Sequence, residues 1–264
     1  EMRFSDDGST WSAWEPYATS KPWTLPAGDG SKTVYVQYRD NVGNISSSYN
    51  DSIILDTVAP TGSILIDGGA TYATSTSVTL NLSASDAGSG VDEMRFSDDG
   101  STWSAWEPYA TSKPWTLPAG DGSKTVYVQY RDLLGNISVS YSNSILLDTT
   151  PPDVDITSPT TSNTLYFTVS WSGTDATSGI ADFDIQYKVG ASGTYVTWLS
   201  ATSLASEQFG PSLPVLVVPG ELYTFRLRAR DNAGNESGYA LSPETETQVL
   251  DVIVNEVFIP LVTR

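Results

Sequence analysis

Short stretches in which apolar and polar residues alternate recur along the whole chain. The clearest is Lys124–Asp132, where Val126, Val128 and Tyr130 fall on one face and polar or charged side chains on the other. A period of two is typical of a strand with one buried face. Ser77–Ala84 has the same pattern, and turns rich in Gly, Asp and Asn separate such stretches throughout. This pattern predicts an all-β chain of short strands.

The clearest of these stretches belongs to a repeat. Glu1–Asp40 reappears letter for letter as Glu93–Asp132, and with a few substitutions the match extends to Thr57 and Thr149. The second copy is preceded by Val58–Asp92, a segment that the first copy lacks. Because a fixed period indicates an array of modules, we predict one complete module and, before it, a module that begins part-way through.

The complete module has the strand content of a β-sandwich of two sheets, with Trp103–Tyr109 among its expected strands. Proline-containing linkers flank it on both sides. The predicted domains are an incomplete sandwich at 1–57, a complete sandwich at 58–149, a third sandwich at 150–250 and a C-terminal strand at 251–264.

The third module carries a resemblance that can be named. Tyr223–Ser237 resembles the penultimate strand and hairpin of a fibronectin type III module, and Trp171 stands where that family has its core tryptophan. Tyr223 matches the family's corner tyrosine, whereas Lys32 and Lys124 occupy the aligned positions of the repeats. The repeats themselves, with their Asp-Thr-Thr-Pro-Pro joints and Arg-Asp-x-x-Gly-Asn hairpins, resemble immunoglobulin-like repeats of bacterial and archaeal surface proteins. The resemblance implies three tandem immunoglobulin-like or fibronectin type III-like β-sandwiches, the first lacking its N-terminal strands.

Composition narrows the function. With 31 acidic against 13 basic residues, the net charge of −18 argues against nucleic acid or an anionic membrane as a partner. No apolar run is long enough to span a bilayer. The chain has no Cys and no His, which removes thiolate, imidazole and Cys/His zinc chemistry. We find no catalytic residue set, and we expect a non-enzymatic protein outside the cell or on its surface.

Carboxylates crowd the turns, and Ca²⁺ is the one cofactor that they suggest. Six to eight oxygens are needed around Ca²⁺, and turns gathered at one end of a sandwich supply such oxygens. Asp86, Asp132 and Asp148 are the candidate ligands. The alternative is that each Asp accepts hydrogen bonds from its own turn.

Two further motifs have a structural and a functional interpretation. Asp98–Trp103 matches the core of the sialidase Asp-box, which is itself a hairpin turn, so we interpret it as a turn. Trp103, Trp106 and Trp115 recur in both copies and are candidates either for core packing or for a platform that binds surface glycans.

The incomplete module predicts an unpartnered face. Without its first two strands, residues 1–57 should leave an inner apolar face partly exposed, and that face is a candidate acceptor for a strand. The residues expected on it are Met2, Phe4, Val34, Val36 and Tyr38.

The C-terminal segment Asp251–Arg264 is unusually apolar for this acidic chain. It is an added edge strand on the third module, a linker that is cut short, or a donor strand for the incomplete module of another copy. The candidate assembly residues of this tail are Val252, Val254, Val257, Phe258, Ile259 and Leu261.

Three functions therefore stay open. The first is a structural subunit of an extracellular filament, a head-to-tail homopolymer assembled by strand insertion. The second is a fragment of a long surface adhesin or stalk whose missing strands lie upstream. The third is a set of sugar-binding accessory modules from a secreted hydrolase.

Overall fold

The computed structural model describes residues 1–210, 216–239 and 244–251. Over these residues the chain is all-β, with nineteen strands and no α-helix. The chain's contacts separate two compact units. One holds Glu1–Gly69, Ser77–Leu117 and Thr125–Ser144, and the other holds Ala70–Thr76, Pro118–Lys124 and the described residues from Ile145 on. No helix in the described ranges has the length and apolar character needed to cross a membrane.

A single antiparallel sheet of three strands forms the N-terminal part. Its strands are β1 (Met2–Ser5), β2 (Gly30–Tyr38) and β3 (Tyr49–Leu55), in the order β1-β2-β3. Met2 pairs with Tyr38 at one end, and Gly30 pairs with Leu55 at the other. No second sheet among the described residues of this part faces it, as the sequence predicts for an incomplete sandwich.

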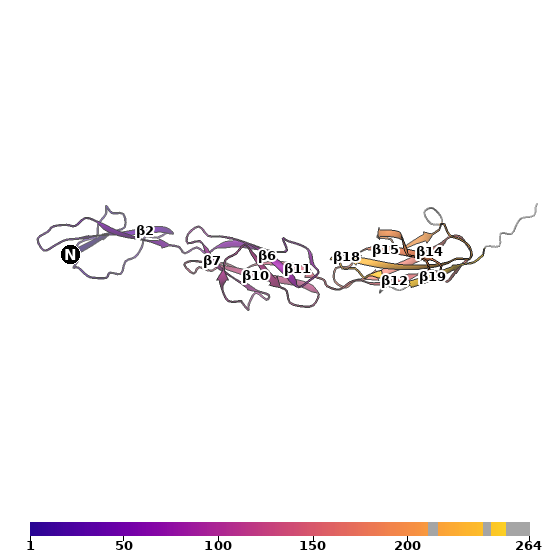
Figure 1. Cartoon of the computed structure of the whole chain (residues 1–264). Coiled ribbons are helices and arrows are strands. Elements are labelled where there is room, and N and C mark those ends of the chain that lie inside the picture. The colour runs from indigo at the N-terminus through magenta and orange to yellow at the C-terminus, as the bar shows by residue number, and fades with distance from the viewer. Residues whose placement is uncertain (211–215, 240–243, 252–264) are drawn as a thin grey trace, which may run out of the picture. The chain divides into compact units, whose positions relative to one another are not determined.

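The complete repeat forms two sheets, one of five strands and one of three (β6, β7, β10 and β11 are labelled in Figure 1). The order in the larger sheet is β5-β11-β10-β7-β8, and in the smaller sheet β4-β6-β9. The strands are β4 (Thr61–Ile66), β5 (Tyr72–Ala73), β6 (Ser77–Ser85), β7 (Val91–Ser97), β8 (Glu107–Pro108), β9 (Ser112–Thr116), β10 (Gly122–Asp132) and β11 (Tyr141–Leu147).

The alternation seen in the sequence decides which side chains fill this second sandwich. Val126, Val128 and Tyr130 of β10 are fully buried, and so is Leu80 of the facing sheet. Two polar contacts tie the sheets together: the Tyr130 hydroxyl donates to the Ser63 carbonyl at 2.7 Å, and the Ile66 amide donates to Asn143 Oδ1 at 3.0 Å. The predicted two-sheet architecture is confirmed.

The third sandwich has the same plan with a different sequence. Its sheets have the orders β13-β19-β18-β15-β16 and β12-β14-β17. The strands are β12 (Asp153–Thr157), β13 (Thr161–Ser162), β14 (Phe167–Thr174), β15 (Ile180–Val189), β16 (Val196–Thr202), β17 (Ser206–Phe209), β18 (Leu222–Asp231) and β19 (Glu244–Val249).

The two side chains singled out by the resemblance lie as that resemblance implies. Trp171 is buried in the core of the third sandwich, and its indole donates to the Leu204 carbonyl at 2.6 Å. The buried Tyr223 hydroxyl accepts a hydrogen bond from the Val218 amide at 2.8 Å, which is the corner bond. At the aligned position of the second sandwich, the Lys124 ammonium donates instead to a backbone carbonyl five residues upstream.

Candidate strand-acceptor face and carboxylate clusters

The inner face of the first sheet is open, and the repeat supplies its covered counterpart. Val126, Val128 and Tyr130 are 0% exposed in the second sandwich. Their counterparts in the first sheet, Val34 and Val36, are only half-buried, and Tyr38 is 38% exposed. Since these residues lie in a stretch of identical sequence, the difference comes from the missing second sheet and not from the residues themselves.

The neighbouring strand shows the same contrast more strongly. Ile53 of β3 is 59% exposed, whereas its counterpart Ile145 of β11 is 2% exposed. Phe4 of β1 is half-buried, whereas Phe96 of β7 is 1% exposed. Apolar surface of this extent on one face of a sheet favours a partner.

One predicted member of the face behaves differently. Met2 is 4% exposed, so the expectation that its side chain would be partly wet is wrong. The reason is local: the Met2 amide donates to the Glu15 carbonyl at 2.8 Å, and the Glu15 amide donates back at 2.9 Å. The chain thus returns along β1 and flanks Met2 on the side away from β2. The open face consists of Phe4, Val34, Val36, Tyr38 and Ile53.

A hollow of about 340 Å³ lies over this open face. Phe4, Val34 and Ile53 line its floor, and Lys21 and Trp23 line its wall. The aromatic ring of Trp23 lies 5.4 Å from that of Phe4, as Trp115 lies 5.3 Å from Phe96 in the other copy. The wall is therefore positioned as in the complete sandwich, while no strand of the described part of the chain lies beside it.

The backbone of that wall is the second sign of a missing strand. Ser112–Thr116 forms β9, which pairs antiparallel with β6. The identical sequence Ser20–Thr24 forms no strand in the first copy. A strand needs a partner for its amides and carbonyls. The segment Ser20–Thr24 is therefore a candidate edge for strand pairing, and we call it, together with the open face, the acceptor site.

The candidate donor residues lie outside the described residues. These are Val252, Val254, Val257, Phe258, Ile259 and Leu261. Their part in assembly stays a prediction from the sequence.

The candidate metal ligands fall into two groups rather than one. Asp86 and Asp132 lie together, with Asp56 of the preceding linker as the third member. Asp148 belongs to a second, equivalent group with Asp175 and Asp231. Each linker aspartate packs against the sandwich that follows it, so Asp148 belongs to another group than Asp86 and Asp132. The shared register of Asp56 and Asp148 in the repeat is the signal that could have separated the groups.

The tryptophans of the outer face stack on arginine. The Arg95 guanidinium lies 5.1 Å from the Trp103 ring and 4.5 Å from the Trp106 ring, and the Arg131 guanidinium lies 4.6 Å from Trp106. The first copy repeats this arrangement. Such stacks stabilise by cation–π attraction. The indoles of Trp103 and Trp106 therefore have a packing role, and this role does not depend on glycan binding.

The Asp-box-like turn is held by its own hydrogen bonds. Asp99 Oδ1 accepts from the amides of Thr102 at 2.6 Å and Ser101 at 2.7 Å, and the Ser97 hydroxyl donates to it at 2.9 Å. These bonds, those from the two backbone amides above all, hold the pKa of Asp99 well below its ordinary value. The interpretation as a plain turn is confirmed.

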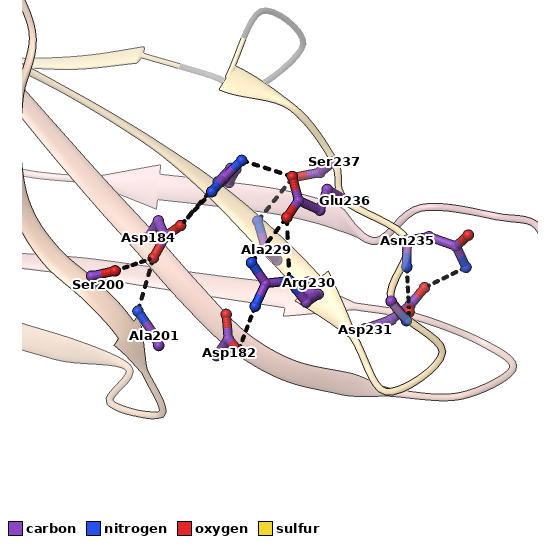
Figure 2. Close-up of polar contacts among 12 residues, drawn as sticks. Asp182, Asp184, Ser200, Ala201, Ala229, Arg230, Asp231, Asn235, Glu236 and Ser237 are labelled. Carbon is purple, nitrogen blue, oxygen red and sulfur yellow. Dashed lines mark hydrogen bonds and ion pairs between the residues drawn. The ribbon is translucent and has the colours of Figure 1, made fainter. Parts of the chain in front are cut away.

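The outer face of the third sandwich carries a network of ion pairs (Figure 2). The Arg228 guanidinium contacts Asp184 at 2.8 Å and Glu236 at 2.7 Å, and Arg230 contacts Glu236 at 2.9 Å. Burial opposes ionisation of Asp184, but hydrogen bonds from Ala201, Arg228 and Ser200 together hold its pKa below the ordinary value. Every charge in this network has a partner, so it cross-links strands and offers no reactive group.

Comparisons with known proteins yield a likeness to solved structures alone. No family model and no curated protein matches the chain. Fibronectin(III)-like modules of Clostridium thermocellum CbhA are similar with a TM-score of 0.36 and 13% identity, over 72% of this chain and 96% of that chain. A tetra-tandem repeat from the extending region of a large adhesion protein is similar with a TM-score of 0.30 and 18% identity. That match covers 95% of this chain and 66% of that chain. The FN1–FN3 domains of chicken CNTN1 are similar with a TM-score of 0.35 and 12% identity, over 83% of this chain and 76% of that chain. At such scores the β-sandwich fold rests on the strand pairing described above.

Proposed function

We propose that the chain is a non-enzymatic structural subunit of an extracellular or cell-surface filament. In this proposal each copy inserts its C-terminal tail into the acceptor site of the next copy. The observation that carries it is the pair of identical sequences: Ser112–Thr116 pairs with β6, whereas Ser20–Thr24 has no partner strand among the described residues. A contact between opposite ends of two copies does not close a dimer, so it propagates into a thread.

The strand that fills the complete sandwich defines what the donor must look like. Val78, Leu80 and Leu82 of β6 point into the core. In the tail, Val257, Ile259 and Leu261 have the same spacing. A donor with this spacing would place three apolar side chains over the open face.

The proline of the tail also fits this alignment. Pro260 takes the place of Asn81 in β6. The Leu82 amide donates to the Thr111 carbonyl, on the side of β9. Successive amides of a strand point to opposite sides, so the Asn81 amide points toward β4. A residue at this position needs no amide hydrogen to pair with Ser20–Thr24. Proline is tolerated where its missing N–H faces away from the ladder.

Asp51 provides an acceptor at a second point of the site. Its counterpart Asn143 accepts the Ile66 amide of β4 through Oδ1. Asp51 is exposed, and its carboxylate keeps an oxygen acceptor at that position. A main-chain amide of a segment in the place of β4, beside a tail in the place of β6, would therefore find a partner there. Burial of the donor's apolar side chains supplies most of the binding free energy, roughly 1.5–3 kcal/mol for each side chain that is fully covered.

The test compares two substitutions in the tail. Ile259→Asp introduces a charge on the inward face, whereas Val262→Asp introduces the same charge on the opposite face. We expect threads in electron micrographs of the wild type and of Val262→Asp, and dispersed subunits for Ile259→Asp and for a chain that ends at Asp251. Threads from the truncated chain would overturn the proposal.

A second candidate has its own observation. In the complete sandwich the acceptor position is filled by Val58–Asp92 of the repeat, so a longer adhesin with another such segment would fill the first sheet in the same way. Two synthetic peptides, 251–264 and 76–92, added to the truncated chain separate the two cases. Binding of the tail peptide supports the filament, whereas binding of peptide 76–92 alone supports the adhesin stalk.

A further inference from the structure

Three buried or half-buried carboxylates meet at the start of the third sandwich. One oxygen from each of Asp148, Asp175 and Asp231 lies within 4.8 Å of the others. Asp148 belongs to the linker that precedes the sandwich, Asp175 follows β14, and Asp231 ends β18. Like charges this close repel one another unless a cation lies between them.

Hydrogen bonds from their own turns hold two of these carboxylates in place. Asp175 Oδ1 accepts the amides of Thr177, Ser178 and Gly179 at 3.1, 2.8 and 2.8 Å. Asp231 Oδ1 accepts the Asn235 amide at 2.9 Å, while its Oδ2 accepts the Asn235 side-chain amide at 2.8 Å (Figure 2). Hydrogen bonds of this kind hold each carboxylate in one orientation.

Asp148 supplies the observation that points to a ligand. Its side chain is 0% exposed, and its Oδ2 has no hydrogen-bond partner. Its Oδ1 accepts the Thr150 amide at 3.2 Å. No ion pair with Lys or Arg involves any of the three aspartates in the described part of the chain. A buried carboxylate oxygen with neither donor nor cation is costly, so this oxygen is suited to a cation.

An equivalent group of aspartates in the second sandwich allows a comparison within the chain. Asp56, Asp86 and Asp132 form the same arrangement at the start of the second sandwich. There, however, the Ser89 amide donates to Asp56 Oδ2 at 2.7 Å, and hydrogen bonding from Ser89 lowers the pKa of Asp56. The oxygen that lacks a partner in Asp148 has one in Asp56. A bound cation would therefore stabilise the Asp148 group more than the Asp56 group.

We propose that Asp148, Asp175 and Asp231 bind Ca²⁺. Three carboxylates, with further oxygens from main chain or water, match the hard, oxygen-only coordination of this ion, and the half-buried Asp175 leaves a way in. The absence of His and Cys disfavours zinc and copper. The Asn235 side-chain amide already joins the Asp148 carbonyl, at 3.0 Å, to Asp231. Binding would add a charged link at the same point, which fixes the linker residue onto the third sandwich.

The test uses Asp175→Asn, Asp148→Asn and a matched control. Asn at 175 keeps an Oδ1 acceptor for the turn amides, so the turn is preserved while the charge is lost. The control is Asp153→Asn, an exposed aspartate of the same sandwich. Calorimetric titration with CaCl₂ should show binding in the wild type and in the control within the range of extracellular Ca²⁺ modules, Kd about 0.1–1 mM. We expect at least a tenfold weaker affinity in Asp175→Asn.

Thermal unfolding with and without chelator gives a second, sign-dependent readout. In chelator, Asp148→Asn should unfold at a higher temperature than the wild type, because the substitution removes one of three repelling charges. In excess Ca²⁺ the order should reverse, because the wild type gains the stabilisation of ligand binding. The proposal is overturned by an unchanged order of melting temperatures, by equal Ca²⁺ affinity of Asp175→Asn and wild type, or by no binding at about 10 mM CaCl₂.

Discussion

The duplicated sequence allows one substitution to be made twice in the same chain, in a covered and in an uncovered setting. Phe96 is 1% exposed, and its ring packs against Trp115 at 5.3 Å. Phe4 keeps the equivalent contact with Trp23 at 5.4 Å but is only half-buried. Replacing each by Ala therefore isolates what the second sheet contributes.

The magnitudes follow from burial. Truncation of a fully buried Phe to Ala costs about 3–5 kcal/mol. Phe4 makes contacts on one side only, so Phe4→Ala should cost roughly half of that or less, about 1–2 kcal/mol. For a sandwich of this size each kcal/mol lowers the melting temperature by about 4–8 °C. Phe96→Ala should therefore lower the transition of the second sandwich by at least about 12 °C.

Differential scanning calorimetry of the chain ending at Asp251 measures both effects without assembly. The transition displaced by Phe96→Ala identifies the second sandwich, and Phe4→Ala should leave that transition in place while moving another by a smaller amount. Equal displacements for Phe4→Ala and Phe96→Ala would refute the reasoning, because they would mean that the first sheet is as well covered as the second sandwich.

Three further predictions concern the complete sandwich. Tyr130→Phe removes the hydrogen bond to the Ser63 carbonyl and should lower the free energy of unfolding by about 1 kcal/mol in urea titrations, whereas Tyr38→Phe should have no effect. Gly62→Ala should be severely destabilising in the same assay, because its Cβ would lie 2.4 Å from a Tyr130 ring carbon and 2.7 Å from a backbone oxygen. Because the folded pKa of Asp99 is lowered, its stabilisation is present above the unfolded value, near 3.8, and is lost as pH falls below it. The melting temperature should therefore fall less between about pH 5 and pH 2 in Asp99→Asn than in the wild type.

The strands with strict alternation could be predicted closely. Lys124–Asp132 lies within β10 (Gly122–Asp132), and Ser77–Ala84 within β6 (Ser77–Ser85). Trp103–Tyr109 is different: it was predicted as a strand, and only Glu107–Pro108 pairs as one. Its tryptophans are held over Arg95 by cation–π contacts, which need no strand geometry. An aromatic-rich stretch thus has two ways to be ordered, and propensity does not distinguish them.

The acceptor site shows a firmer limit of sequence-based prediction. Ser20–Thr24 and Ser112–Thr116 are identical, yet β9 is formed only where β6 lies alongside. No local signal separates two identical segments, so the difference lies wholly in tertiary partners. The same holds for the carboxylates: the turns predict which aspartates are held by their own backbone, but chain topology decides that Asp148 meets Asp175 and Asp231.

In the proposed filament, a strand from a second copy covers the open face of the first sheet. The chain has no cysteine, so a single thiol introduced by Val36→Cys or by Val128→Cys reports on one position each. In dispersed, tail-truncated subunits, the thiol at position 36 should react rapidly with a maleimide. The thiol at position 128, fully buried in the native chain, should react roughly a thousandfold more slowly, since it must wait for the sandwich to open.

The same two thiols are then compared in threads formed by the chain that carries its tail. Strand insertion predicts that the thiol at position 36 becomes protected in threads, so that its rate of reaction with maleimide approaches the rate at position 128. Removal of the tail should restore fast labelling at position 36. A thiol at position 36 that reacts as fast in threads as in truncated subunits would contradict strand insertion at this face.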